Sequence, residues 1–147
     1  MLLVVLFAAG LVVATGFLHY EVLRGLNVRL PGLVLPDRFK LLVVIAAAFV
    51  THALEILLYG LAIYVLVGVA GVGSLAGASE SLWSACLYFS AETYTSLGFG
   101  DLTPTGPVRF LAGVEALNGL LLIGWTASFT YIAMERFWKT PGPGGDA

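Results

Sequence analysis

Charged residues are scarce in this chain. Of its 147 residues, 59% are hydrophobic and only 11% are charged, whereas an ordinary soluble domain carries roughly 25% charged residues. Residues 1–17 contain no acidic or basic residue, and residues 41–73 contain only His52 and Glu55. Apolar runs of this length can cross a bilayer, which requires about 20 residues. The composition therefore excludes an ordinary water-soluble domain and predicts a protein embedded in the lipid bilayer.

Cysteine and basic clusters are also missing. The single cysteine, Cys86, excludes an internal disulfide framework and is too little for a cysteine metal cluster. The net charge is −2 and the basic residues form no run, so no nucleic-acid partner is expected. Lysine and arginine do not recur at every third position of any apolar run, as they do in a voltage sensor. No catalytic or organic cofactor site is evident, and we expect no enzyme activity.

The first apolar run covers residues 2–23 and has two interpretations. Small residues at 14–16 resemble a signal-peptide cleavage site, but the basic segment that precedes such a run is missing. The positive charges follow the run instead, and the positive-inside rule then places the next loop in the cytoplasm. The N-terminus is accordingly expected outside, and His19 and Glu21 at the cytoplasmic interface. The positive charges are Arg24, Arg29, Arg38 and Lys40.

Two further apolar runs, residues 41–70 and 110–134, are long enough to span the membrane. Arg136 and Lys139 follow the third run and mark a second cytoplasmic end. Residues 70–109 are then outside, and the Gly- and Pro-rich residues 139–147 are expected to be a disordered tail. The pattern predicts a multi-pass protein of the cell (inner) membrane with a cytoplasmic C-terminus.

The outer stretch between the second and third runs is too apolar for a solvated loop. Residues 82–89 are mostly hydrophobic, yet the run to about Tyr94 is too short to cross a bilayer. Ser79 suits a helix N-cap and Glu80 a first helical turn. We therefore predict a re-entrant half-helix over residues 80–95.

Residues 96–100 follow the half-helix and must be non-helical. Such backbone survives at membrane depth only if it is buried in protein or lines an aqueous cavity. Gly98 and Gly100 permit positive φ at alternate positions, so successive carbonyls can point to one side. Leu97 and Phe99 are then expected to point backwards and pack on the half-helix. Four copies would form a cage of oxygens that replaces the hydration shell of a cation, and the negative end of the half-helix dipole near Thr95 favours a positive ion.

The segment from Thr93 to Asp101, T-Y-T-S-L-G-F-G-D, resembles the potassium-channel signature T-x-T-T-x-G-[YF]-G-D. The resemblance extends over residues 83–138. It implies a pore that assembles as a homotetramer with a re-entrant pore helix in each subunit. Together with the three apolar runs, it predicts an all-α membrane protein with three transmembrane helices in each chain. It also implies that carbonyls of Ser96, Leu97, Gly98 and Phe99 bind dehydrated K⁺, and that the Ser96 hydroxyl completes the innermost site. The expected ligands are K⁺ ions in the filter, with no organic cofactor.

The domain boundaries follow from the spans and the resemblance. Residues 1–40 form an additional transmembrane helix and a cytoplasmic loop. Residues 41–138 form the pore domain, with an outer helix, the pore helix, the filter at 96–100 and an inner helix at 108–138. Passive K⁺ conduction is the expected function.

The filter departs from the most frequent family sequence, T-V-G-Y-G. Ser96 replaces threonine, Leu97 replaces valine and Phe99 replaces tyrosine. Phenylalanine lacks the hydroxyl that bonds to the pore helix, so a softer outer filter is expected. Two other functions remain open: a weakly selective cation channel, and a non-conducting membrane adaptor or sensor. In isolation, G-x-G is also compatible with an ordinary tight turn.

Glu92 and Asp101 lie on either side of the filter, and the resemblance implies that they pair behind it. Tyr88 occupies a position where the family often has a tryptophan that bonds to the aspartate. The alternative is that both acids are solvated at the outer mouth.

His52 and Glu55 lie three residues apart on one face of the second span, and polar groups at this depth require a partner. We expect them to bond to each other, with Glu115 on the third span as another candidate partner. The group has structural, proton-sensing and metal-binding interpretations, although His52, Glu55 and Glu115 have no diagnostic metal spacing.

Gly119 and Gly124 on the third span are candidate gating positions. Gly119 lies near the place of a family hinge glycine, but close helix packing is an equally good explanation. By the same alignment, four side chains are expected to face the cavity and inner gate: Leu120, Ile123, Ala127 and Tyr131.

Overall fold

The computed structural model describes residues 1–78 and 81–138 and consists mainly of four α-helices. Three of them, α1 (Leu2–Arg29), α2 (Asp37–Tyr64) and α4 (Val108–Phe137), are long and apolar enough to cross a membrane. A 3₁₀ turn (Leu30–Gly32) ends α1, and a π-helical turn (Val65–Val69) extends α2. The predicted three spans and all-α membrane fold are confirmed. The expected tail at 139–147 lies outside the described residues, as do Ser79 and Glu80.

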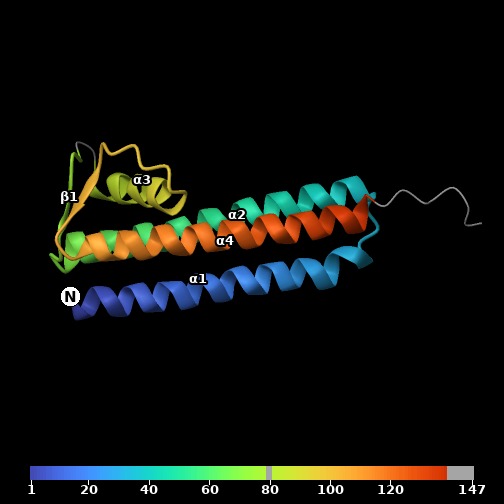
Figure 1. The fold of residues 1–147 in the computed structure, drawn as a ribbon, viewed down its shortest axis with the longest axis horizontal. Coiled ribbons are helices and arrows are strands. Elements are labelled where there is room, and N and C mark those ends of the chain that lie inside the picture. Colours follow the sequence, from blue (N-terminus) through green and yellow to red (C-terminus); the bar gives the residue numbers. More distant parts are fainter. Residues whose placement is uncertain (79–80, 139–147) are drawn as a thin grey trace, which may run out of the picture.

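The three long helices run side by side, and each reverses the direction of the one before it. In Figure 1 the N-terminus lies at one end of the bundle, and the α1–α2 connection and the end of α4 lie at the other. α1 packs against both α2 and α4. Pro31 and Pro36 flank the connection, where a proline ends one helix and begins the next without disrupting either.

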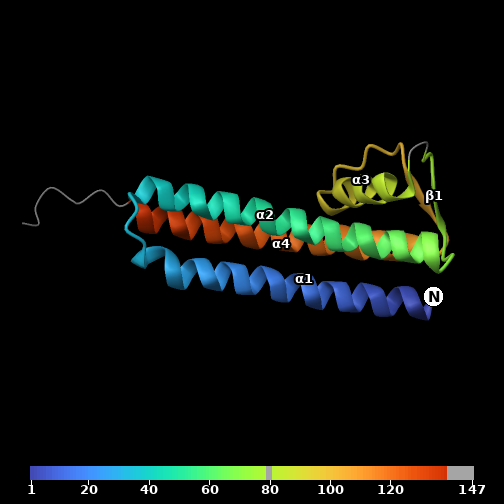
Figure 2. The ribbon, with the colours of Figure 1, turned by 180° about the vertical axis from the view of Figure 1, so that it is seen from behind.

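The fourth helix, α3 (Leu82–Tyr94), is short and lies across from α1, against α2 and α4 (Figure 2). It begins two residues later than predicted, because the Ser81 hydroxyl accepts a hydrogen bond from the Ser84 N–H at 3.2 Å and caps it. At 13 residues it is too short to span a bilayer. The re-entrant arrangement predicted from the sequence is therefore present.

Two short strands hold the segments on either side of α3 together. β1 (Ser74–Ala76) pairs antiparallel with β2 (Thr103–Thr105), with Leu75 opposite Pro104. Gly73 and Gly77 flank β1 with φ of +95°, and a Cβ at Gly77 would lie 2.1 Å from the Asp101 carbonyl oxygen. Glycine is required here because the two chains approach so closely. The sequence did not predict this pairing.

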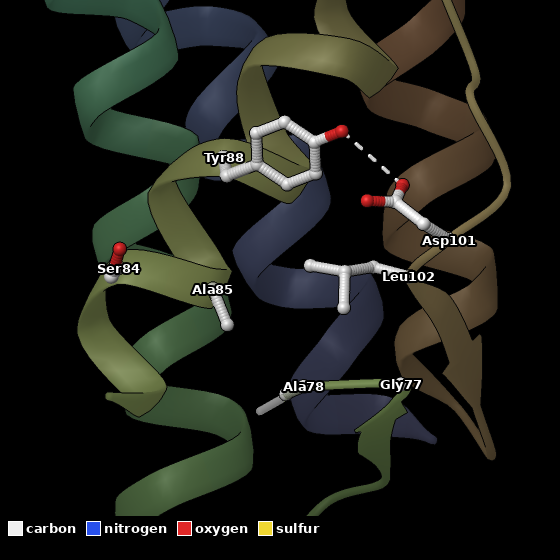
Figure 3. Close-up of a pocket in the computed structure, with 7 residues that line it drawn as sticks. All are labelled: Gly77, Ala78, Ser84, Ala85, Tyr88, Asp101 and Leu102. Carbon is white, nitrogen blue, oxygen red and sulfur yellow. Dashed lines mark hydrogen bonds between the residues drawn. The ribbon is translucent and has the colours of Figure 1, made fainter. Parts of the chain in front are cut away.

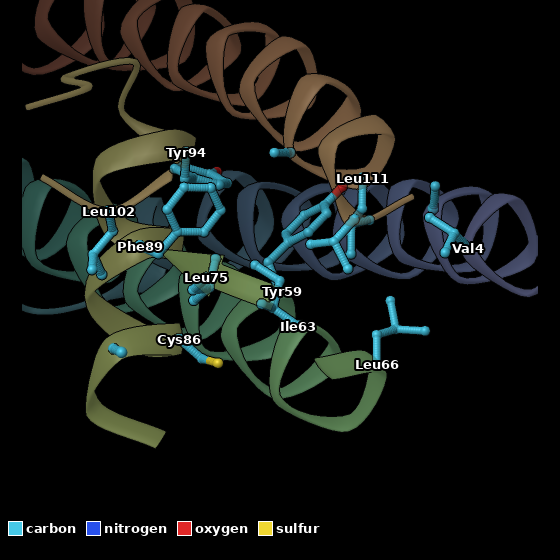
Figure 4. Close-up of a cluster of buried hydrophobic side chains, with 14 residues drawn as sticks. Val4, Tyr59, Ile63, Leu66, Leu75, Cys86, Phe89, Tyr94, Leu102 and Leu111 are labelled. Atoms are coloured by element: carbon cyan, nitrogen blue, oxygen red, sulfur yellow. The ribbon is translucent and has the colours of Figure 1, made fainter. Parts of the chain in front are cut away.

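The main hydrophobic core lies at the α3 end of the bundle. Figure 4 shows side chains from all four helices meeting there, among them Val4 of α1, Tyr59 of α2, Phe89 of α3 and Leu111 of α4. Many apolar side chains on the outer faces of α1 and α2 remain exposed. Such a surface suits contact with lipid rather than water.

Candidate functional site

The predicted filter segment, residues 96–100, begins where α3 ends. The N–H of Leu97 donates to the Glu92 carbonyl at 2.8 Å, and the N–H of Ser96 donates to the Thr93 carbonyl at 3.0 Å. The Thr95 hydroxyl also bonds back, to the Ala91 carbonyl at 2.7 Å. These bonds satisfy carbonyls at the helix C-terminus. They also hold the start of the segment next to the negative end of the α3 dipole.

The filter backbone alternates in conformation. φ is +57° at Ser96, +56° at Gly98 and +81° at Gly100. Glycine adopts this region without steric cost, but serine does so rarely. The strained position is Ser96, whose N–H bond to α3 holds it there.

The side chains of the filter do not pack as predicted. Leu97 is 58% exposed and Phe99 is 67% exposed, so neither packs behind the filter on its own half-helix. The packing of Leu97 and Phe99 behind the segment is therefore not seen in the single chain. Thr95, Ser96, Gly98 and Gly100 are exposed as well.

Two separate hydrogen bonds connect α3 to the end of the predicted filter, one at Phe99 and one at Asp101, which directly follows it. The Glu92 side chain accepts a hydrogen bond from the Phe99 N–H at 3.1 Å. The Tyr88 hydroxyl donates to Asp101 Oδ1 at 3.2 Å (Figure 3). Glu92 and Asp101 therefore each have a separate hydrogen-bond partner. These two bonds, rather than a direct Glu92–Asp101 contact, connect the segment to α3.

The environment of Glu92 favours its protonated form. Burial raises the pKa of this carboxyl, the nearby Asp101 charge raises it further, and the bond from Phe99 opposes the shift only in part. Glu92 is buried while Asp101 is exposed. A pocket of about 410 Å³ adjoins Tyr88 and Asp101, and Gly77 and Leu102 also line it.

The C-terminal end of α3 rests directly on α4. A Cβ at Gly119 would lie 2.2 Å from the Tyr94 carbonyl oxygen and 3.0 Å from its carbonyl carbon. Gly119 therefore serves close packing, whereas nothing lies within 4 Å of a Cβ at Gly124. The structure thus gives the two candidate gating glycines different surroundings.

A cluster of polar side chains lies between the helices, next to Tyr94 at the C-terminal end of α3. His19 Nδ1 and His52 Nδ1 each lie 3.0 Å from a different carboxylate oxygen of Glu55, and the Tyr94 hydroxyl donates to Glu55 as well. Thr126 Oγ1 lies 2.9 Å from His52 Nε2 and 3.1 Å from His19 Nε2. The cluster therefore joins all four helices.

His19 was wrongly expected at the cytoplasmic interface. The residue is fully buried, because α1 continues to Arg29 and places it well inside the helix. Thr15 and His19 lie four residues apart and, with Val4, Ala8 and Leu23, are the buried residues of α1. This spacing of two polar residues within an apolar run was a signal available in the sequence.

Glu115 joins a different group from the one considered. Its Oε1 accepts a hydrogen bond from the Ser90 hydroxyl at 2.6 Å, and Ser90 also lies 2.8 Å from the Ile56 carbonyl. Glu115 Oε2 is the one buried side-chain polar atom without a partner among the described residues. The candidate metal ligands His52, Glu55 and Glu115 therefore do not come together. The residue that lies beside His52 and Glu55 is His19.

The predicted cavity residues share an exposed part of α4. Leu120, Ile123, Ala127 and Tyr131 are all exposed in the single chain. Asn118, on the buried face of the helix, donates to Thr15 Oγ1 at 2.8 Å and to the Tyr59 hydroxyl at 3.1 Å. One face of α4 therefore packs against α1 and α2, and the face that carries these four residues is exposed in the single chain.

Comparison with known proteins decides the family. The model of a family described as "Ion channel" matches residues 41–136, which is well over half of the chain. The chain belongs to this ion-channel family, whose members have the two-transmembrane potassium-channel pore. The matched residues begin in α2 and include α3, the predicted filter segment and nearly all of α4, whereas α1 lies outside the match.

Protein LctB of Geobacillus stearothermophilus is 36% identical to this channel over 63 residues. The aligned residues make up 43% of this chain and 47% of that protein, so the alignment spans about half of the relative's length. No solved structure matches the channel.

Proposed function

We propose that this channel is a homotetramer that conducts K⁺ passively and selectively through residues 96–100. The observation that carries the proposal is the T-S-L-G-F-G segment at the end of a re-entrant helix, with positive φ at alternate residues. Carbonyls of Ser96, Leu97, Gly98 and Phe99 would replace water around the ion, together with the Ser96 hydroxyl. Conduction follows the electrochemical gradient and includes no chemical step.

Four copies account for surfaces that one chain leaves open. A single filter strand supplies too few oxygens to surround a cation, and exposed non-helical backbone is costly at membrane depth. The exposed Leu97 and Phe99 side chains then contact neighbouring subunits. The exposed face of α4, with Leu120, Ile123, Ala127 and Tyr131, lines the central cavity.

The distribution of positive charge supports an outward-facing filter. Arg29 at the end of α1 and Arg136 at the end of α4 lie at the end of the bundle opposite to α3 (Figure 1). Arg38 and Lys40 at the start of α2 lie at this same end. The positive-inside rule places this end in the cytoplasm, with the N-terminus and the filter on the outside of the cell membrane.

K⁺ efflux from liposomes tests conduction directly. Vesicles that contain the purified protein should lose K⁺ faster than empty vesicles. Gly100→Ala should abolish this flux, because φ of +81° at Gly100 strains any residue with a Cβ. Gly113→Ala is the matched control, since a Cβ there meets nothing within 4 Å. Flux equal to that of empty vesicles would support the non-conducting alternative.

A further inference from the structure

We propose that His19, His52 and Glu55 form a binding site for a divalent transition-metal ion of the Zn²⁺ class. These residues each offer one ligand atom, and the three atoms lie within 4.8 Å of one another. They include both histidines of the chain. The site is separate from the filter and concerns a different ion.

The separations suit a small cation. Zn²⁺ binds imidazole nitrogen at about 2.0–2.1 Å and carboxylate oxygen at about 2.0–2.2 Å, so ligand atoms around a tetrahedral ion lie roughly 3.4 Å apart. His19 Nδ1 lies 3.0 Å from one oxygen of Glu55, and His52 Nδ1 lies 3.0 Å from the other. All three ligand atoms lie within 4.8 Å of one another, so rotations of the side chains that bring the two histidine nitrogens to about 3.4 Å would admit the ion between them.

Thr126 supplies an independent argument. Its hydroxyl oxygen faces the Nε2 atoms of both histidines, at 2.9 and 3.1 Å. The one proton of the Thr126 hydroxyl can serve only one Nε2 atom, so at least one of the two rings carries its proton on Nε2 and leaves its Nδ1 lone pair free for another partner. If Nδ1 of each ring binds a metal, both Nε2 atoms carry protons, and the two lone pairs of Thr126 accept both.

This arrangement is the usual support for metal-binding histidines. Such a histidine donates its other ring N–H to a fixed acceptor, which sets the tautomer and the ring orientation. Tyr94 provides a further oxygen next to the proposed site. Its hydroxyl lies 2.9 Å from His52 Nδ1 and bonds to Glu55, so it can complete a four-coordinate set.

The donor set also selects the class of ion. Two imidazole nitrogens and one carboxylate favour Zn²⁺ and similar transition metals, whereas Mg²⁺ and Ca²⁺ prefer oxygen ligands. His19 and Glu55 are fully buried and His52 is partly exposed. The ligands come from α1 and α2, and their neighbours Tyr94 and Thr126 come from α3 and α4, so a bound metal would join α1 to the base of the pore helix.

Metal binding to tag-free, chelator-treated protein tests the site, whether or not the protein conducts. Elemental analysis after addition of Zn²⁺ and removal of excess should show one ion per chain. Co²⁺ should give the strong visible absorption of a four-coordinate ion, and Zn²⁺ should abolish it. Absence of bound Zn²⁺, or only the weak absorption of hydrated Co²⁺, would overturn the proposal. This spectrum requires no variant and so does not depend on mutant folding.

Variants then assign the ligands. His19→Gln and His52→Gln should lose the ion, and Thr126→Val should weaken binding about 10- to 100-fold, as loss of a supporting partner does. Glu115→Gln is the matched control, because this buried acid bonds to Ser90 and not to the cluster. The control should bind Zn²⁺ like the parent. Unchanged Zn²⁺ affinity in a folded His19→Gln protein would contradict the site and leave the three side chains with only a structural, hydrogen-bonding role.

Discussion

Gly119 sets the distance between α4 and the pore helix. An added Cβ would meet the backbone of Tyr94, which cannot move aside like a flexible side chain. Overpacking of this kind typically costs about 1–3 kcal/mol. Gly119→Ala should therefore lower the thermal stability of the channel and displace the base of the filter, with loss of K⁺ flux.

The control for this prediction is Gly113→Ala on the same helix. A Cβ there meets nothing within 4 Å, and alanine is the better helix former by up to about 1 kcal/mol. The control should melt no lower than the parent in detergent. Equal melting temperatures and flux for Gly119→Ala and Gly113→Ala would contradict the packing role of Gly119.

Glu92 should make stability depend on pH. Because burial and Asp101 raise its pKa in the folded protein, the folded state holds the proton at pH values where the unfolded chain has lost it. The stabilisation that Glu92 gives the folded protein by holding this proton is fully present below the ordinary glutamate pKa. It is lost as pH rises through the raised pKa of the folded state. Melting temperature should therefore fall over this window more in the parent than in Glu92→Gln. Parallel curves would refute the assignment.

Single residues differed in how far the sequence predicted their surroundings. The three-residue spacing of His52 and Glu55 predicted their mutual bond, because neighbours on one helical face are fixed by local geometry. The partners His19, Tyr94 and Thr126 come from three other helices. No local pattern specifies such contacts, so the full cluster required the structure.

At the scale of elements, α1 is attached to the pore domain by polar as well as apolar contacts. Asn118 of α4 donates to Thr15 of α1 and to Tyr59 of α2, and it is buried. Hydrogen bonds between membrane helices contribute on average about 0.6 kcal/mol and at most about 1.7 kcal/mol. This bond is one of the links that hold α1 against the other two spans.

Asn118→Ala should accordingly lower stability within this range and loosen α1. The measurement is thermal unfolding in detergent, together with protease sensitivity of the α1–α2 connection. Ser128→Ala is the control, since the exposed Ser128 hydroxyl bonds only within α4, to the Gly124 carbonyl. If both variants unfold like the parent, the Asn118 contacts do not hold α1.

The spans and the re-entrant helix were predictable because long apolar runs and their flanking charges are properties of continuous segments. The β1–β2 pair was not, because it joins two three-residue strands about 30 positions apart, with no alternating apolar pattern. The start of α3 was predicted two residues early because Ser79 and Ser81 both suit an N-cap by residue type, and Ser81 is the one used.

At the scale of the whole molecule, the proposed assembly should be stabilised by its own ion. A ligand that binds only the folded tetramer adds stability by mass action. The tetramer should therefore dissociate at a higher temperature in KCl than in NaCl at equal ionic strength. Native mass spectrometry in a mild detergent would identify the species that melts. Only monomers and dimers, or identical melting in the two salts, would count against a tetrameric K⁺ filter.

Reversal potential is the most direct test of K⁺ selectivity. The purified channel in a planar bilayer, with KCl on one side and an equal concentration of NaCl on the other, should reverse far from zero. The sign should be the one at which the voltage opposes K⁺ flow, because the carbonyl cage formed by Ser96, Leu97, Gly98 and Phe99 is proposed to favour K⁺ over Na⁺. Currents that reverse near zero would contradict this account and identify a weakly selective cation channel.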